Sequence, residues 1–240
     1  MMNYSELKSV LKTIWNFIWN DDSIWSWLVN IVLAFVIIKF IVYPSLGLIL
    51  GTNFPIVAVV SSSMEHNSIG GCVLYDESSF IGISYKSCVK KSYAICGNQY
   101  DTKRSFNVNE YWEECKEWYN TNTDISLEEF SEYKFKNGFN KGDIMILIGA
   151  KPQDINMGDV IVFQSKKPDP IIHRVVRKWS DNRGYHFSTK GDHNERSIKD
   201  FLIDETDIHE SKLLGKAAIR IPLLGYVKIW FVELIKLVTF

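Results

Sequence analysis

Three adjacent serines, residues 61–63, directly follow the β-rich run FPIVAVV. A later strand-like run contains His173, and Asp192 and Asp200 lie at and beyond a glycine turn. A serine hydroxyl becomes a nucleophile when a base removes its proton and a third group holds that base in the right tautomer. These residues are therefore candidates for such a triad. By themselves they are more typical of a polar turn and a structural histidine than of a catalytic site.

A metal-dependent hydrolase is an alternative interpretation of the same histidines. Its ligands would be His66, His173, Asp192 and His193. Such a site requires these side chains to converge on one ion with an open coordination position. His186 and His209 are more typical of surface or structural positions. The same holds for His193 when it is considered alone. We expect no metal and no other cofactor.

The elements that must position the triad candidates are short strands. From Gly142 onward the segments IMILIGA, VIVFQS, IIHRVVRKW and GYHFSTKG alternate with turn-forming sequences. Short strands with tight turns and no intervening helical pattern predict an antiparallel, partly barrel-like β domain. We therefore expect a mainly β fold, whose catalytic domain combines residues 52–66 with residues 141–218.

An apolar run precedes this domain and is interrupted by few polar residues, among them Lys39. At about 1.5 Å per residue, it is long enough to cross a hydrocarbon core about 30 Å thick. We predict a leader at residues 1–23 and a transmembrane anchor at residues 24–51, which makes the lipid bilayer a partner. Residues 219–240 are also apolar but carry recurring charges, so a tilted span and an interfacial helix both remain open.

Residues 67–140 are richer in Asn, Ser, Tyr, Trp and charged residues than the segments on either side, and they are predicted to form an inserted mixed lobe. They contain all four cysteines, Cys72, Cys88, Cys96 and Cys115. Two disulfides would allow three connectivities, and buried free thiols remain an alternative. The cysteine spacings contain no C-x-x-C pair, which disfavours zinc. The net charge of −1 removes the electrostatic basis for a nucleic-acid partner.

Several strings resemble the type I signal peptidases, and they occur in that family's order behind an anchor. They are VSSSME at 60–65, KGDI at 141–144, MGDVIVF at 157–163, IHRVV at 172–176, TKGDHN at 189–194, GK at 215–216 and RIPLLG at 220–225. The base position separates the subgroups, because bacterial members generally have lysine where this chain has His173. The resemblance therefore indicates the archaeal and endoplasmic-reticulum-like subgroup.

The resemblance implies a membrane-bound serine endopeptidase that removes signal peptides from exported preproteins. It implies Ser63 as the nucleophile, His173 as the base, and an oxyanion hole formed by the Ser63 N–H and the Ser61 hydroxyl. Two acids follow the base in this family, and Asp200, more than Asp192, is expected to orient His173. The catalytic domain would lie on the extracytoplasmic side of the cell membrane. Further partners would be the protein-export channel or other membrane subunits.

The chain departs from the family pattern at three places. His66 stands where the family usually has proline, Ser62 stands where glycine is common, and the lobe at residues 67–140 is unusually long. Because the matched motifs all lie outside the lobe, we expect it to be dispensable for peptide-bond chemistry. An alternative function is a non-catalytic membrane-anchored binding or assembly subunit of the same fold; the altered loop at Ser62 and His66 counts mildly for it, and the intact Ser63 and His173 count against it.

Overall fold

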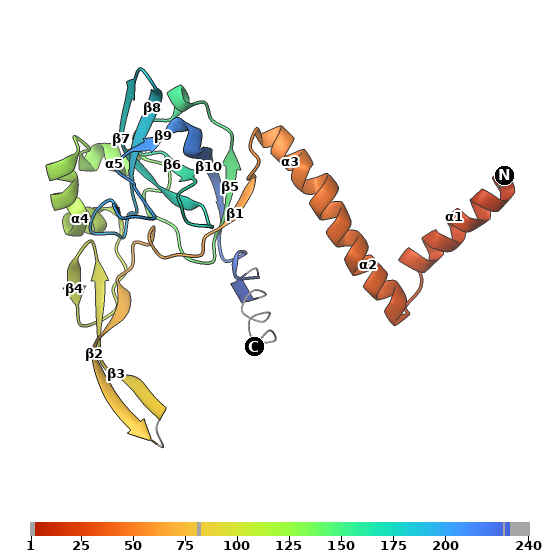
Figure 1. Ribbon diagram of the computed structural model, residues 1–240, viewed down its shortest axis with the longest axis horizontal. Helices are drawn as coiled ribbons and strands as arrows, with labels where there is room; N and C mark the ends of the chain where they lie inside the picture. The colour runs from red at the N-terminus through yellow and green to blue at the C-terminus, as the bar shows by residue number, and fades with distance from the viewer. Residues whose placement is uncertain (1–2, 81–82, 228, 231–240) are drawn as a thin grey trace. The chain divides into compact units, whose positions relative to one another are not determined.

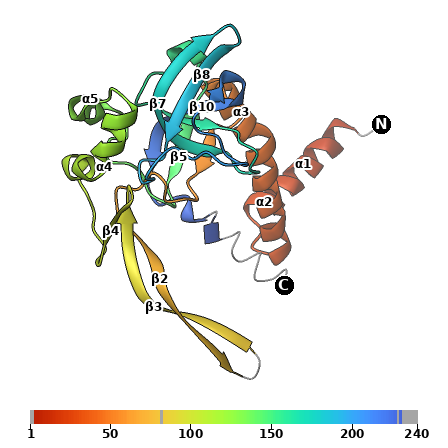
Figure 2. The same ribbon diagram turned by 60° about the vertical axis from the view of Figure 1, so that its left-hand side comes forward.

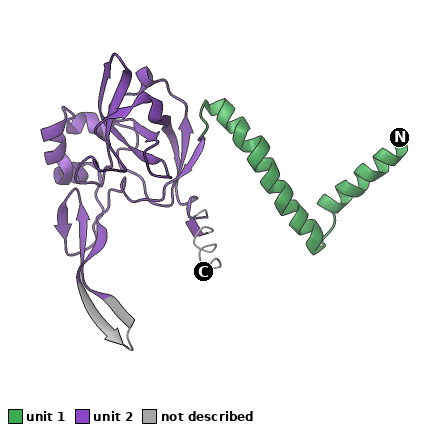
Figure 3. Ribbon diagram, in the orientation of Figure 1, with its two compact units in different colours: residues 1–53 green, residues 54–240 purple. Residues whose placement is uncertain are grey.

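The computed structural model describes residues 3–80, 83–227 and 229–230, with side chains described outside residues 75–86. The chain divides into two compact units, Met1–Asn53 and Phe54–Phe240 (Figure 3). Each unit is described separately below.

Unit 1 consists of helices. Helix α1, Tyr4–Trp19, begins at a capping box formed by Asn3 and Glu6. A longer helix runs without a break through α2 (Ile24–Ile37), the π-helical turn η1 (Ile38–Val42) and α3 (Tyr43–Leu50). Pro44 lies in the first turn of α3, directly after the π-helical turn, which is where the irregular backbone accommodates a residue without an N–H group. Gly51 ends the helix in the left-handed conformation at φ 67°.

The segment Ile24–Leu50 is long and apolar enough to cross a membrane. Its 27 residues correspond to about 40 Å at the helical rise. It coincides with the segment for which the sequence predicted an anchor. Insertion of this helix into a bilayer remains a prediction.

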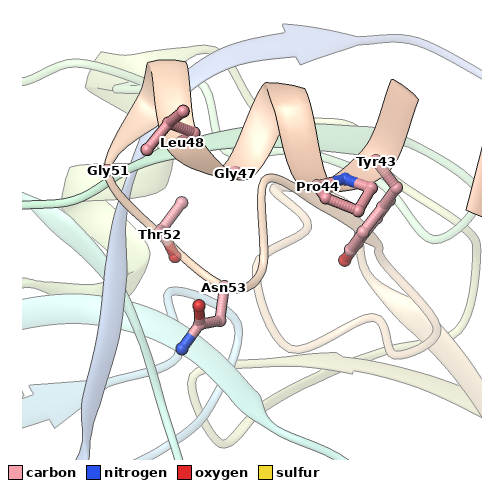
Figure 4. Close-up of a pocket in the computed structure, with 7 residues that line it drawn as sticks. All are labelled: Tyr43, Pro44, Gly47, Leu48, Gly51, Thr52 and Asn53. Atoms are coloured by element: carbon pink, nitrogen blue, oxygen red, sulfur yellow. The ribbon is translucent and has the colours of Figure 1, made fainter. Parts of the chain in front are cut away.

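A hollow of about 620 Å³ lies where this helix ends (Figure 4). Its wall consists of Tyr43, Pro44, Gly47, Leu48, Gly51, Thr52 and Asn53. The Thr52 N–H donates to the Gly47 carbonyl over 3.0 Å, so the chain turns back beneath the helix. None of the triad candidates lines this hollow.

Unit 2 is built on a seven-stranded antiparallel sheet in the order β1-β5-β10-β6-β7-β8-β9 (Figures 1 and 2). The strands are β1 (Ile56–Ala58), β5 (Ile144–Ile148), β6 (Val160–Phe163), β7 (Ile171–Asp181), β8 (Gly184–Lys190), β9 (Ile208–His209) and β10 (Leu213–Ile221). Short 3₁₀ turns occupy Pro152–Asp154 and Glu210–Lys212. One cleft is lined by residues of both β1 and β7, which are separated by three strands in the sheet order, so the sheet is curled.

Both faces of the sheet are buried at its centre. Val160 and Val162 of β6 belong to one apolar cluster, together with Met64. The alternate residues Ile161 and Phe163 belong to another cluster on the opposite face. The period of two in a strand explains this division, and it explains why the β6 sequence VIVF is apolar at every position.

The inserted lobe combines a small sheet with two helices. Its elements are β2 (Ile69–Phe80), β3 (Ile83–Ile95), β4 (Asn98–Tyr100), α4 (Val108–Asn122) and α5 (Leu127–Glu132). Figures 1 and 2 both show β2 and β3 leaving the rest of the unit as a two-stranded ribbon. The cysteines form the disulfides Cys72–Cys88 and Cys96–Cys115, a pairing that the sequence had left open.

The predicted mainly β fold is confirmed by the antiparallel sheet. Strand β10 continues to Ile221, beyond the residue 218 at which we expected the β domain to end. Of the C-terminal segment that was left open between a span and an interfacial helix, residues 228 and 231–240 lie outside the described residues.

Candidate active site

Ser63 and His173 face each other across the curled sheet. The Ser63 Oγ lies 2.7 Å from the His173 Nε2, although the two residues are 110 positions apart in the sequence. His173 lies on β7, where it pairs with Ile161 of β6, and its side chain is almost fully buried. Ser63 lies in the loop that follows β1. The hydroxyl is therefore within hydrogen-bonding distance of a base held on a rigid strand.

Backbone hydrogen bonds hold the loop that carries Ser63 on both sides. Before Ser63, the Val59 N–H donates to the Asp143 carbonyl over 2.8 Å. After it, the Phe139 N–H donates to the Met64 carbonyl over 3.0 Å, and the His193 N–H donates to the Ser63 carbonyl over 2.9 Å. The Met64 side chain is fully buried in the core. The motif methionine thus anchors the loop by packing.

Glu205 is the carboxylate that contacts the catalytic candidate His173. Its Oε1 is hydrogen-bonded to the His173 Nδ1 and accepts from the Thr189 hydroxyl over 2.9 Å. Its Oε2 accepts from the Ile198 N–H over 2.7 Å. The Glu205 side chain is fully buried. Both carboxylate oxygens are therefore fixed, and the imidazole is held with Nε2 towards Ser63.

The structure corrects the acid that we expected to orient His173. Asp200 is exposed, and its Oδ1 accepts from the N–H groups of Leu202 and Ile203, each over 2.7 Å. This is a local turn that an aspartate forms with the two residues after it. Glu205, not Asp200, reaches the imidazole, because the chain turns at Asp200 and returns along β8.

Asp192 pairs with Arg174 and not with His173, which it was considered to orient. Its Oδ1 accepts from the Arg174 Nε over 2.8 Å and its Oδ2 from the Arg174 Nη2 over 2.6 Å. The His66 Nε2 lies 3.1 Å from the same Oδ2. Burial raises the pKa of Asp192, but the Arg174 charge and the hydrogen bonds from Arg174 and His66 outweigh it, so the pKa lies well below its usual range. Asp192 is thus ionised and forms a buried ion pair with Arg174, the residue that follows His173 on β7.

His66 occupies this site as a neutral donor. Burial lowers the pKa of His66, and the hydrogen bond to Asp192 offsets part of that effect. Because an ionised carboxylate only accepts hydrogen bonds, the His66 Nε2 must carry the proton in this pair. His66, which the sequence singled out as a departure, therefore has a defined contact.

A cleft of about 310 Å³ opens at Ser63. Its apolar wall consists of Val57, Ala58, Val60, Ile171, Ile172, Ile198 and Ile203, and its polar part includes Ser61, Lys167 and Asp169. The Ser61 Oγ lies 3.1 Å from the Ser63 Oγ. The cleft therefore brings an apolar surface, the serine hydroxyl of Ser63 and a second hydroxyl together.

Gly191 makes the approach of the two catalytic candidates possible. A Cβ at this position would lie 2.8 Å from the His173 Nε2 and 2.7 Å from the Ser63 carbonyl oxygen. These distances are shorter than van der Waals contact, so a larger residue would separate Ser63 from His173. The glycine of the matched TKGDHN string thus has a steric explanation.

Two of the histidines considered as metal ligands, His66 and His173, are engaged elsewhere. The His173 Nε2 faces Ser63 and its Nδ1 faces Glu205, while His66 bonds to Asp192. Within residues 3–80, 83–227 and 229–230, no group of three or more His, Cys, Asp or Glu side chains has an arrangement that could hold a metal ion.

Sequence reasoning missed Glu205 because it considered only aspartates near the glycine turn. One signal could have directed attention to its segment, which also contains Asp204 and Asp207. Glu205 stands between the apolar residues Ile203 and Ile208 in an otherwise polar stretch, and both of these isoleucines are buried. An acid in such a stretch is a candidate for a buried polar contact, and glutamate serves as the third group in some triads.

The side chains of the candidate site have a known arrangement. A buried carboxylate bonded to an imidazole, which is bonded to a serine hydroxyl at an open cleft, is the arrangement of a serine hydrolase. In this chain a curled antiparallel sheet holds that arrangement.

The chain is similar to catalytic subunits of the signal peptidase complex. It is 33% identical over 98 residues to the signal peptidase complex catalytic subunit SEC11 of Pyricularia oryzae, and also to that of Colletotrichum graminicola; each match covers 40% of this chain and 57% of the relative. It is 33% identical over 94 residues to the signal peptidase complex catalytic subunit SEC11C of Canis lupus familiaris, covering 38% of this chain and 49% of the relative. The chain thus spans about half the length of the curated relatives it matches. No protein-family model matches it.

Proposed function

We propose that this chain is a membrane-anchored serine endopeptidase that removes signal peptides from exported preproteins. The observation that carries the proposal is the 2.7 Å contact between the Ser63 Oγ and the His173 Nε2, with Glu205 bonded to the other ring nitrogen. The names of the similar proteins, catalytic subunits of the signal peptidase complex, support the substrate class. This proposal differs from the sequence prediction in one residue: Glu205, in place of Asp200, is the third member of the triad.

In this mechanism His173 removes the Ser63 proton as the hydroxyl attacks the carbonyl carbon of the scissile bond. The same imidazole then returns the proton to the leaving amine, and water hydrolyses the acyl-enzyme. Glu205 stabilises the imidazolium that forms between these steps. The oxyanion is bound by the Ser63 N–H and by the hydroxyl of Ser61, whose Oγ lies 3.1 Å from the Ser63 Oγ. Loss of one such donor typically costs about 3 kcal/mol of barrier.

The substrate binds as an extended peptide in the cleft beside β1. Strand β1 is an edge of the sheet and pairs with β5 on one side. An edge strand can add a peptide strand through its free backbone groups, and alternate side chains then enter the cleft. The apolar wall around Ile172 and Ile203 suits small apolar side chains next to the cut. The helix Ile24–Leu50 anchors the chain in the cell membrane, and the catalytic domain acts on the extracytoplasmic side.

The decisive experiment incubates the detergent-solubilised full chain with a preprotein and maps the cut by mass spectrometry. We expect one cut after a small residue near the end of the signal peptide. Ser63→Ala should remove detectable cleavage, since loss of a triad serine lowers kcat by a factor on the order of 10⁶. Ser62→Ala is the matched control, because it deletes a neighbouring hydroxyl from the same loop.

Two results would contradict the proposal. An inactive Ser62→Ala protein beside an active Ser63→Ala protein would move the nucleophile to Ser62. A wild-type chain that binds the preprotein without cutting it would favour the non-catalytic subunit. Cleavage measured with EDTA present tests the metal-dependent alternative. Chelation should leave the rate of a serine mechanism unchanged and should abolish a metal-dependent one.

A further inference from the structure

The inserted lobe contacts the segment that holds the nucleophile loop. Residues Asp192 and His193 lie between the lobe on one side and the Ser63 loop on the other. Their N–H groups face the loop: the His193 N–H donates to the Ser63 carbonyl over 2.9 Å, and the Asp192 N–H lies 3.4 Å from the Met64 sulfur.

The carbonyl groups of the same two residues face the lobe. The Tyr111 hydroxyl of α4 donates to the Asp192 carbonyl over 2.9 Å. The Cys96 N–H donates to the His193 carbonyl over 2.9 Å. The disulfide Cys96–Cys115 links these two lobe donors, because Cys115 lies on the same helix as Tyr111. The peptide unit between Asp192 and His193 thus connects the lobe directly to the nucleophile loop, because its carbonyl accepts from Tyr111 and its N–H donates to Ser63.

The side chains of this region form a second connection. The Tyr111 ring stacks on the His66 ring with centroids 3.7 Å apart and planes within 4°. His66 in turn bonds to Asp192, the partner of Arg174, which directly follows His173 on β7. The Arg174 guanidinium also lies over the Phe130 ring of α5, 5.0 Å from its centroid. Lobe aromatics therefore pack against Arg174 and against His66, which is hydrogen-bonded to Asp192.

These contacts are buried and specific. Tyr111 and Tyr119 are fully buried, and their hydroxyls lie 3.2 Å apart. Burial raises the pKa of both phenols, so each remains a protonated donor. Since the Tyr111 proton goes to the Asp192 carbonyl, the Tyr119 proton goes to the Tyr111 oxygen. Of these two tyrosines, Tyr111 is the one that donates a hydrogen bond to the segment Asp192–His193.

We propose that the inserted lobe is part of the catalytic unit and that Tyr111 is a positioning residue for Ser63. This inference rests on the proposed function and replaces the expectation that the lobe is dispensable for peptide-bond chemistry. Tyr111 acts through Asp192 and His193. The N–H groups of these two residues fix the position of the Ser63 loop relative to His173. It does not contact substrate.

The test compares Tyr111→Phe with Tyr119→Phe in the full chain. Both changes delete one buried phenol hydroxyl from the same cluster, but only the first removes the hydroxyl that donates to the Asp192 carbonyl over 2.9 Å, the shortest contact to that oxygen from the lobe. With an internally quenched peptide that has alanine at the first and third positions before the cut, we expect kcat of Tyr111→Phe to fall about tenfold. Its KM should stay unchanged, because the cleft walls are untouched. Tyr119→Phe should retain the wild-type kcat.

Hydrogen exchange of the His193 amide gives a readout that needs no turnover. We expect this amide to exchange faster in Tyr111→Phe than in Tyr119→Phe, because its acceptor is the Ser63 carbonyl. Equal kcat values in the two variants would overturn the proposal, whatever their melting temperatures. If the wild-type chain cleaves no peptide, the proposed function fails instead. In that case hydrogen exchange of the His193 amide is the remaining test of whether Tyr111 positions the Ser63 loop. Equal exchange rates in the two variants would overturn the link between lobe and loop.

Discussion

At the scale of single residues, the site depends on how each nitrogen of His173 is used. The Nε2 faces the Ser63 hydroxyl and the Nδ1 faces Glu205. Thr189 and the Ile198 N–H fix the carboxylate from two further directions. The imidazole therefore has one tautomer compatible with its surroundings, in which Nδ1 carries the proton and Nε2 accepts from Ser63.

Glu205→Gln should lower kcat by about four orders of magnitude, because an amide in place of the carboxylate favours the wrong tautomer. Asp200→Asn should retain most activity, since Asp200 serves a turn away from the imidazole. Steady-state kinetics of the two variants, with melting temperatures as a check on folding, make the comparison. An inactive Asp200→Asn enzyme beside an active Glu205→Gln enzyme would return the orienting role to Asp200.

At the scale of elements, helix α4 covers the end of strand β8. The side chain of Lys190, the last residue of β8, is fully buried. Its Nζ lies 5.2 Å from the centroid of Trp118 and 5.1 Å from that of Tyr119. It also lies 3.3 Å from the Gly191 carbonyl. Aromatic faces and a carbonyl thus replace the water that an exposed lysine would have.

This burial predicts a particular pH dependence. Burial lowers the pKa of Lys190 to about 8 from 10.5, although the Asp192 and Glu205 charges oppose it. Between these two values the unfolded chain binds more protons than the folded chain, so the unfolding free energy rises with pH. Relative to Lys190→Met, the wild-type chain should therefore gain about 2–3 kcal/mol between pH 8 and 10.5.

Denaturant unfolding at several pH values measures that difference. The Met variant keeps a side chain of similar length and removes the titrating group. Lys199→Met, at an exposed position, is the control and should show no such rise. A difference between wild type and Lys190→Met that is independent of pH would contradict the expectation.

At the scale of the whole molecule, the chain separates an apolar helix from a domain that carries the candidate site. Residues Met1–Asn53 form one compact unit and Phe54–Phe240 the other (Figure 3). All residues of the candidate triad, its cleft and the lobe belong to the second unit. The first unit contains the helix Ile24–Leu50, whose apolar side chains are largely exposed.

We expect Ile24–Leu50 to insert into a bilayer when placed in a soluble reporter between two glycosylation sites. Membrane insertion should leave one site glycosylated after translation with microsomes, whereas full translocation modifies both. Leu33→Arg should raise the apparent insertion free energy by about 3 kcal/mol, and Leu33→Ile should leave it nearly unchanged. Full translocation of the wild-type segment would exclude it as an anchor.

The features that depend on local order could be predicted from the sequence. The apolar run predicted the long helix, and short strand-like segments separated by turn-forming sequences predicted the antiparallel strands that the structure contains. The motifs singled out Ser63 and His173, which the structure places 2.7 Å apart. Each of these signals is encoded in neighbouring residues, either as a helical or strand period or as a short string.

Only the tertiary structure decided the remaining contacts. It selected Glu205 over Asp200 at His173, paired the four cysteines, and placed Tyr111 against Asp192. In each case the partners are separated by at least 16 residues, and several residues of the same type compete in the sequence. Which of them meet depends on how the loops return to the sheet, because a carboxylate or hydroxyl bonds over about 3 Å and only to a group that the fold brings to it.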